Sequence, residues 1–224
     1  IMALILCIES ATRSCSVALA KNGNLFDFKE EVNEKYSHSE QLTLFIESLL
    51  RKRGIVFSDL DAIAVSKGPG SYTGLRIGVS TAKGLCYALD KPLISIFTLE
   101  AMASGMQKKY PNKVYCPMID ARRMEVYTAF FQAGKQLTDI EAHIVETDSF
   151  SKILSKEEVL FFGDGADKCQ GLITHVNAIF ITNVYPSAKD MAELAEKAFV
   201  QQQFENVAYF EPYYLKDFVT GVKK

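Results

Sequence analysis

The first third of the chain shows a pattern of apolar and polar positions typical of an antiparallel strand meander followed by an amphipathic helix. The Asn22-Gly23 pair before the third apolar run has the residues that a tight hairpin turn requires. Within residues 38–53, apolar side chains recur three and four positions apart, as on one face of a helix. The three apolar runs that fit strands are residues 4–8, 16–20 and 25–32.

A strand, helix and strand are expected next. Residues 61–66 read as a buried strand, a turn rich in glycine and proline follows, and residues 72–89 read as a second helix before a strand at 93–97. A crossover of this kind joins parallel strands. The sequence therefore predicts an α/β lobe with a mixed sheet.

The second half repeats this plan. Fourteen positions separate Glu9 from Gly23, and the same number separate Asp120 from Gly134, each within an apolar strand, acidic residue, turn, strand and glycine. We therefore expect two lobes, residues 1–103 and 104–224, with the last helix a candidate to pack back on the first lobe. The further strands are expected at 159–162 and 178–181, and the further helices at 164–173 and 187–204.

Composition places the chain among globular proteins, because 48% of its 224 residues are hydrophobic and 23% are charged. Its apolar runs are far shorter than the roughly 20 residues that a membrane helix needs. A soluble, cytoplasmic protein without a membrane partner is expected. The formal net charge of -2 offers no extended basic surface for nucleic acid, so any RNA should be held mainly by another subunit.

Metal and nucleophile chemistry has little support in the sequence. The three histidines are isolated from one another, and the five cysteines include no C-x-x-C pair. Ser71 lacks the G-x-S-x-G context of a hydrolytic serine. We therefore expect no bound metal and no catalytic residue. The residues concerned are His38, His143, His175, Cys7, Cys15, Cys86, Cys116 and Cys169.

The densest motif is the run GPGSYTG, which lies between a predicted strand and a predicted helix. A helix start of this kind suits a phosphate group, whereas the commoner interpretation is a turn that merely joins the two elements. Glu9, at a strand end, is open to the same two interpretations, and so is the pair Arg122-Arg123, which would bind phosphate or RNA or simply remain solvated. The candidate phosphate or nucleotide contacts are Glu9, Gly68, Gly70, Ser71 and Thr73.

Small residues recur every four positions along the second helix and leave a flat stripe for a close neighbour. Glycine in a helix interior is about 1 kcal/mol less favourable than alanine, so the stripe needs a packing reason. The neighbour is either a helix of the same chain or a helix of a partner. The expected partner surface consists of His38, Leu42, Phe45, Tyr72, Gly74, Leu75, Gly78 and Ala82.

Five strings together resemble the bacterial TsaB family, also called YeaZ: LCIESATRSCSVAL, GPGSYTGLRIG, IDARRMEVY, FFGDGA and YYLKDF. The resemblance spans nearly the whole chain. It implies a two-lobed actin-like, ribonuclease H-like α/β fold with mixed sheets and flanking helices. It also implies a non-catalytic scaffold subunit in the complex that adds threonylcarbamoyl to the adenosine beside the anticodon of tRNAs reading codons that begin with A.

The same resemblance implies the partners: a TsaD-like catalytic subunit, a TsaE-like ATPase, a second copy when the chain is isolated, and tRNA only indirectly. TsaD-like relatives carry a metal-binding histidine pair at helical spacing, which residues 99–109 lack. No tightly bound cofactor is therefore expected, with ATP or ADP placed at the partner interface. Two alternatives stay open, an actin-like ATP-binding enzyme using GPGSYTG and residues 163–166, and a glycoprotease-like metallopeptidase.

Overall fold

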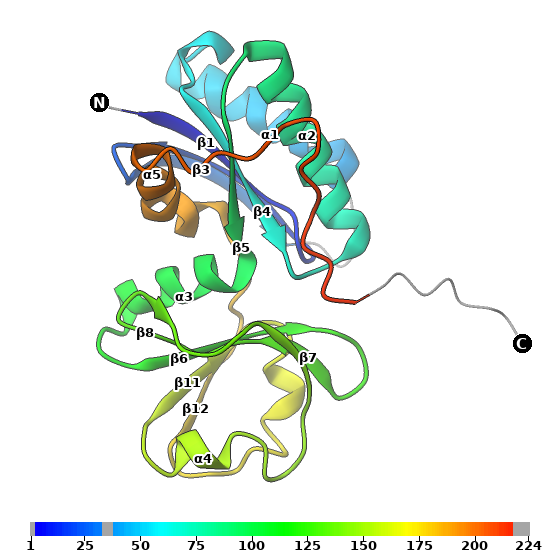
Figure 1. The fold of residues 1–224 in the computed structure, drawn as a ribbon, viewed down its shortest axis with the longest axis vertical. Helices are drawn as coiled ribbons and strands as arrows, with labels where there is room; N and C mark the ends of the chain where they lie inside the picture. The colour runs from blue at the N-terminus through cyan, green and yellow to red at the C-terminus, as the bar shows by residue number, and fades with distance from the viewer. Residues whose placement is uncertain (1–2, 33–37, 217–224) are drawn as a thin grey trace, which may run out of the picture.

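Two mixed β-sheets, one in each half of the molecule, lie on either side of a single helix (Figure 1). The structure is a computed structural model, and it describes residues 3–32 and 38–216. No helix in this part of the chain combines the length and the apolar character needed to cross a membrane.

The first sheet has the strand order β3-β2-β1-β4-β5, in which β1, β2 and β3 are antiparallel and β1, β4 and β5 are parallel. Asn22 and Gly23 form the β2–β3 turn with φ angles of 54° and 73°, which confirms the expected hairpin. The elements of this half are β1 (Leu4–Glu9), β2 (Ser14–Lys21), β3 (Asn24–Val32), α1 (His38–Arg53), η1 (Phe57–Asp59), β4 (Ala62–Gly68), α2 (Tyr72–Leu89) and β5 (Leu93–Phe97).

Helices cover both faces of the first sheet, because alternate side chains of a strand point to opposite sides. In β1, Leu6 and Ile8 pack with α1 and α2, whereas Ile5 and Cys7 pack with α5 (Ala192–Val200). The α5 face is lined largely with alanine from β2 and β4, which lets this helix approach the sheet closely. Although α5 follows the second sheet in the chain, it completes the first lobe.

The second sheet repeats the first. Its order β10-β7-β6-β11-β12 has the same pattern of antiparallel and parallel neighbours, and Ala133 and Gly134 form the equivalent turn with φ angles of 50° and 72°. Its elements are β6 (Val114–Asp120), β7 (Glu125–Thr128), β8 (Phe131–Gln132), β9 (Lys135–Gln136), β10 (Glu141–Ile144), α4 (Ser151–Leu154), β11 (Val159–Phe162), η2 (Asp167–Cys169) and β12 (Ala178–Ile181). The 3-10 turn η3 (Ala188–Met191) comes next in the chain, but its buried residues pack beneath the first sheet beside α5.

Helix α3 (Thr98–Lys109) joins the two halves and contributes to both cores. Leu99, Met102 and Met106 pack on the second sheet, while Ala101 belongs to the core beneath the first sheet. At Gly105 the helix meets the Asp190 carboxyl group so closely that an added Cβ would overlap it. A side chain at this position would therefore have to displace the Asp190 carboxyl group.

Two expected helices differ from the structure. The helix expected at residues 164–173 is wrong, because the segment is a loop with one short 3-10 turn, η2. It carries three glycines in and beside it, Gly163, Gly165 and Gly171, and Gly163 has a φ of 109° that helices do not contain. The helix expected at 187–204 begins as the 3-10 turn η3 and is α-helical over α5 alone.

The glycine stripe of α2 packs inside the first lobe. A Cβ added at Gly74 or Gly78 would overlap Ser10, the residue that follows β1, and the Ser10 hydroxyl donates to the Gly74 carbonyl oxygen at 2.9 Å. Figure 1 shows α2 lying along β1 and β4. The neighbour for which the stripe is shaped is thus the strand end of its own lobe.

This packing predicts opposite effects for alanine at two glycines of the same helix. Gly78→Ala should lower the free energy of unfolding by ~1–3 kcal/mol, because the methyl group displaces the Ser10 side chain from a filled space. Gly84→Ala should raise it by up to ~1 kcal/mol, because Gly84 is exposed with no atom within 4 Å of an added Cβ. Urea unfolding of the two variants measures both effects; equal changes would contradict the packing argument.

Candidate functional site

The two sheets bring the acidic residues singled out by their spacing to equivalent places. Glu9 ends β1 and Asp120 ends β6, each immediately before the turn to the next strand of its sheet. The glycines Gly68 and Gly163, at the ends of β4 and β11, share a φ of 109°. Each lobe therefore presents the same pair of turns, and the candidate site consists of these four turns.

Glu9 is fully buried, and its carboxylate contacts groups of its own lobe. Its Oε1 accepts hydrogen bonds from the Ala11 backbone N–H at 2.6 Å and from the Ser66 hydroxyl at 2.8 Å. Its Oε2 has no hydrogen-bond partner among the described residues. Burial raises the pKa of Glu9 to about 7, and the two hydrogen bonds oppose that rise only in part.

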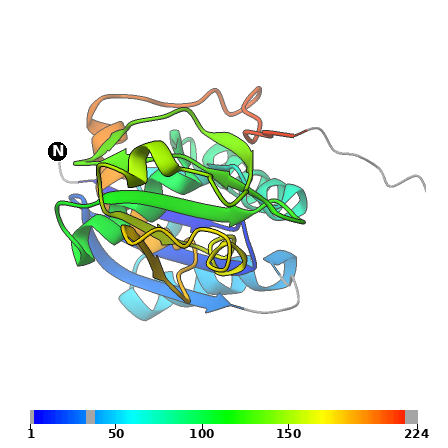
Figure 2. The same cartoon turned by 90° about the horizontal axis from the view of Figure 1, so that it is seen from below.

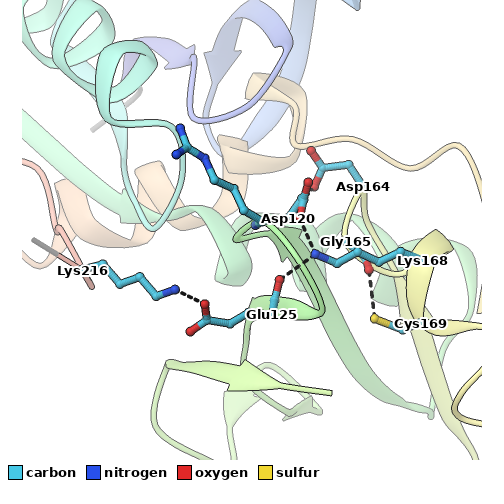
Figure 3. A network of polar contacts seen from close by, with 8 residues as sticks. Asp120, Glu125, Asp164, Gly165, Lys168, Cys169 and Lys216 are labelled. Atoms are coloured by element: carbon cyan, nitrogen blue, oxygen red, sulfur yellow. Dashed lines mark hydrogen bonds and ion pairs between the residues drawn. The ribbon is translucent and has the colours of Figure 1, made fainter. Parts of the chain in front are cut away.

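Asp120 belongs to a polar network on the second lobe, shown in Figure 3. Its carboxylate accepts a hydrogen bond from the Arg122 backbone N–H at 2.9 Å and forms an ion pair with Lys168. Its own N–H donates to Asp164 Oδ1 at 3.0 Å, and Lys168 also donates to the Glu125 carbonyl oxygen at 2.7 Å. Asp164, part of the candidate turn at residues 163–166, and Lys168, which the sequence did not single out, hold the β6–β7 turn against the loop after β11.

The GPGSYTG turn lies directly on the β1–β2 turn. The Ser71 N–H donates to the Ala11 carbonyl oxygen at 2.6 Å, and an added Cβ at Gly70 would overlap the same oxygen. Ser71 Oγ accepts from the Gly74 N–H at 3.3 Å, so the side chain caps α2. Phosphate binding by this turn stays a prediction; its capping and packing are sufficient to account for the residue types at Gly70 and Ser71.

The expected partner surface stays a prediction, and most of its residues lie inside the lobe. Of its eight residues, seven are buried within the single chain, and Tyr72 is half-buried. His38 Nε2 lies 2.6 Å from the Thr12 carbonyl oxygen, while Leu42 and Phe45 belong to the first core. In the single chain these residues pack α1 and α2 onto the rest of the lobe, so other positions of the two helices face solvent. The exposed positions of the two helices include Leu44, Thr73, Arg76, Ser80 and Tyr87.

The chain after α5, residues 204–216, returns along α2 and is called here the C-terminal strap (Figures 1 and 2). It begins with a hydrogen bond from the Glu205 N–H to the Leu93 carbonyl oxygen at 2.8 Å. Lys83 on α2 then donates to the Phe210 carbonyl oxygen at 2.9 Å. Sequence reasoning missed the course of this segment, because residues 205–216 form no helix or strand of their own and their partners lie far away in the sequence.

The strap ends at the second lobe. The Tyr213 N–H donates to the Lys67 carbonyl oxygen at 2.7 Å, and the Tyr213 ring packs edge-on against Phe97 with centroids 5.3 Å apart. Lys216 then forms an ion pair with Glu125 on β7 (Figure 3). The strap therefore contacts both halves of the molecule beside the candidate site.

Side chains that bind metals do not gather in the described part of the chain, where no three of histidine, cysteine, aspartate and glutamate form a group that could hold an ion. The five cysteines are buried and unpaired. Burial raises the pKa of Cys7, Cys15 and Cys86 to about 12, so their thiols stay protonated near neutral pH. The thiols therefore pack as apolar groups.

Comparison with known proteins places this arrangement in a family. The family described as tRNA N6-adenosine threonylcarbamoyltransferase, TsaD, matches residues 33–224. The tRNA threonylcarbamoyladenosine biosynthesis protein TsaB of Haemophilus influenzae is 29% identical, with 98% of this chain and 96% of that protein covered. The TsaB of Buchnera aphidicola from Schizaphis graminum is 30% identical, with 84% and 90% covered.

A solved structure agrees with the sequence relatives. A Pseudomonas aeruginosa protein described as similar to peptidase YEAZ superposes with a TM-score of 0.85 at 26% identity, covering 96% of this chain and 100% of that one. The expected two-lobed actin-like α/β fold is thereby confirmed. The chain belongs to the TsaB (YeaZ) family, within the wider TsaD family, and its family acts in tRNA threonylcarbamoyladenosine biosynthesis.

Proposed function

We propose that the chain is a non-catalytic partner subunit of a complex that adds threonylcarbamoyl to the adenosine beside the anticodon of tRNAs reading codons that begin with A. Its principal partner is a TsaD-like catalytic subunit, a TsaE-like ATPase is the third member, and a second copy takes the partner's place in isolation. The chain itself holds no tightly bound cofactor, and ATP or ADP lies at the interface with the partner. The assembly works in the cytoplasm.

The state of the two strand-end carboxylates carries this proposal. The buried Glu9 carboxylate accepts hydrogen bonds from the Ala11 N–H and the Ser66 hydroxyl. The Asp120 carboxylate forms an ion pair with Lys168 and accepts a hydrogen bond from the Arg122 N–H. A carboxylate that is to bind an ion or a reacting group needs free oxygen atoms facing a site that the substrate can reach. The Glu9 Oε2, which has no hydrogen-bond partner among the described residues, is fully buried, where a substrate does not reach it, and Asp120 Oδ1 is already bound by Lys168 and the Arg122 N–H. This arrangement supports a scaffolding role over the ATP-binding enzyme or the metallopeptidase.

The exposed side of α1 and α2 is the proposed docking surface. Leu44 on α1 is 61% exposed and Tyr87 on α2 is 86% exposed, so two large apolar side chains face solvent on these helices. Isolated apolar residues on a surface are ordinary, but tyrosine is enriched at protein interfaces and anchors many of them. A groove of 330 Å³ lies between α2 and the strap and is lined in part by Ser80 and Lys83. A side chain of the partner would fit into it.

Co-expression with a TsaD-like protein of the same organism tests the central claim. A stable complex is the expected result. When an activated threonylcarbamoyl donor and the TsaE-like ATPase are added, the complex should modify tRNA, and this chain without the TsaD-like protein should not. ATP binding measured on the isolated chain and on the complex separates the partner role from the enzyme alternative. Tight ATP binding or ATP hydrolysis by the isolated chain would favour the enzyme.

The docking surface is tested by a bulky charge on the exposed face of α2. Ser80→Arg should weaken association with the TsaD-like partner by ~5- to 150-fold, the equivalent of the ~1–3 kcal/mol that overpacking costs. The melting temperature should not change, because Ser80 is exposed in the free chain. Ser155→Arg, an exposed serine at the end of α4, is the matched control and should leave association intact. Equal affinities of the two variants for the TsaD-like partner would contradict the proposal that α2 lies in the interface.

The buried carboxyl of Glu9 predicts a pH dependence of stability. Its pKa of about 7 in the folded chain lies above the ordinary value of 4.5, so the folded state favours the protonated form. The resulting stabilisation is fully present below about pH 4.5 and is lost as the pH rises through about 7.

Glu9→Gln cannot ionise and should escape this loss. The free energy of unfolding of the variant, relative to the wild type, should therefore rise by ~3 kcal/mol between about pH 5 and about pH 8. Asp190, whose pKa burial raises to about 6, titrates in both proteins and largely cancels from the difference. Urea unfolding at the two pH values makes the measurement; a difference that does not vary with pH would show that Glu9 is ionised throughout.

A further inference from the structure

The turn between β6 and β7 carries two arginines in a conformation that arginine rarely adopts. Arg122 and Arg123 are consecutive, both exposed, with φ angles of 72° and 48°. Two successive left-handed residues are usually asparagine and glycine, and a non-glycine residue held there by strain costs roughly 1–3 kcal/mol. The backbone thus gives no reason for arginine at either position.

The turn is built by other groups. The Ala121 N–H donates to the Glu125 carbonyl oxygen, and the Glu125 N–H donates to the Arg122 carbonyl oxygen, both at 3.1 Å. The Asp120 carboxylate caps the Arg122 N–H. None of these bonds involves an arginine side chain. The two guanidinium groups are therefore not needed to form the turn.

The charges around the turn leave these two groups unbalanced. Two neighbouring carboxylates are already paired, Asp120 with Lys168 and Glu125 with Lys216, while the third, Asp164, forms no ion pair with a described residue and accepts the Asp120 N–H (Figure 3). In the described part of the chain, neither arginine guanidinium forms an ion pair or a hydrogen bond. A chain of net charge -2 therefore exposes two uncompensated positive charges side by side at the edge of the candidate site.

We propose that Arg122 and Arg123 form a direct contact with tRNA, each binding a phosphate group of the RNA backbone. A guanidinium group presents paired N–H donors that match two phosphate oxygens, and an RNA strand supplies phosphates in succession. The choice of RNA follows from the family's place in tRNA modification and does not require the partner role proposed above. The contact adds to whatever part of the tRNA the catalytic subunit holds.

A variant with the residues that the turn favours separates binding from structure. The double variant R122N/R123G should fold with unchanged or higher stability, because asparagine and glycine relieve the left-handed strain. Its affinity for tRNA should nevertheless fall by about 60-fold near 0.1 M salt, since each lost phosphate contact removes about 0.9 from the slope of log affinity against log salt. If the two arginines served only the turn, this stable variant would bind tRNA as tightly as the wild type does.

The measurement is fluorescence anisotropy of the full chain with an unmodified tRNA that reads a codon beginning with A, between about 50 and 200 mM salt. R122K/R123K keeps both charges and should retain the salt slope. K152Q/K156Q removes two exposed charges from the region of α4, and it should bind tRNA as the wild type does. The thermal stability of every variant is measured alongside.

Three results would overturn the proposal: no tRNA binding by the wild-type chain, equal salt slopes for R122N/R123G and the wild type, or equal losses in the α4 control. Association with the TsaD-like partner is measured for the same variants. A loss of partner affinity with tRNA affinity retained would instead assign the two arginines to a protein contact. Because the partner assay is separate, failure of the tRNA contact and failure of the proposed scaffold role can be told apart.

Discussion

The close contact between Ser10 and the glycine face of α2 determines much of the first lobe. Ser10 is held against α2 by its hydrogen bond to the Gly74 carbonyl oxygen. Because Ser10 directly follows Glu9, this contact also fixes the Glu9 carboxyl group beside Ala11 and Ser66. The contact needs Gly74 and Gly78 together, since a methyl group at either would occupy the space of the serine. A carboxyl that would otherwise face solvent at a strand end is thereby enclosed, and its raised pKa follows from that enclosure.

The two lobes share a topology but differ at their turns. In the first, the carboxyl is buried and the glycine turn packs on the strand end, so the polar groups point inward. In the second, the Asp120 side chain is nearly half exposed and forms an ion pair with Lys168, and the turn carries two exposed arginines. The same topology therefore gives a packed turn in the first lobe and an exposed, charged turn in the second.

Sequence reasoning succeeded where one residue pattern has one physical solution. The Asn22-Gly23 turn, the apolar faces of α1 and α2, and the acidic-to-glycine spacing of the two halves all predicted the observed strands and order. It failed where the partner of a feature lies far away in sequence. The glycine stripe fits a helix as well as Ser10, 64 residues from Gly74, and spacing alone cannot choose between them. Lys168 and the strap were missed for the same reason.

The position of α5 and the strap in the chain has a consequence for folding during synthesis. The second sheet is formed from consecutive residues, Val114–Asp120 to Ala178–Ile181, whereas the first lobe lacks one of its covering helices until residues 192–200 leave the ribosome. The alanine-lined face of β1, β2 and β4 therefore stays uncovered while the whole second lobe is made. For this chain the usual order, in which the N-terminal unit folds first, is reversed: the later lobe can finish before the earlier one closes.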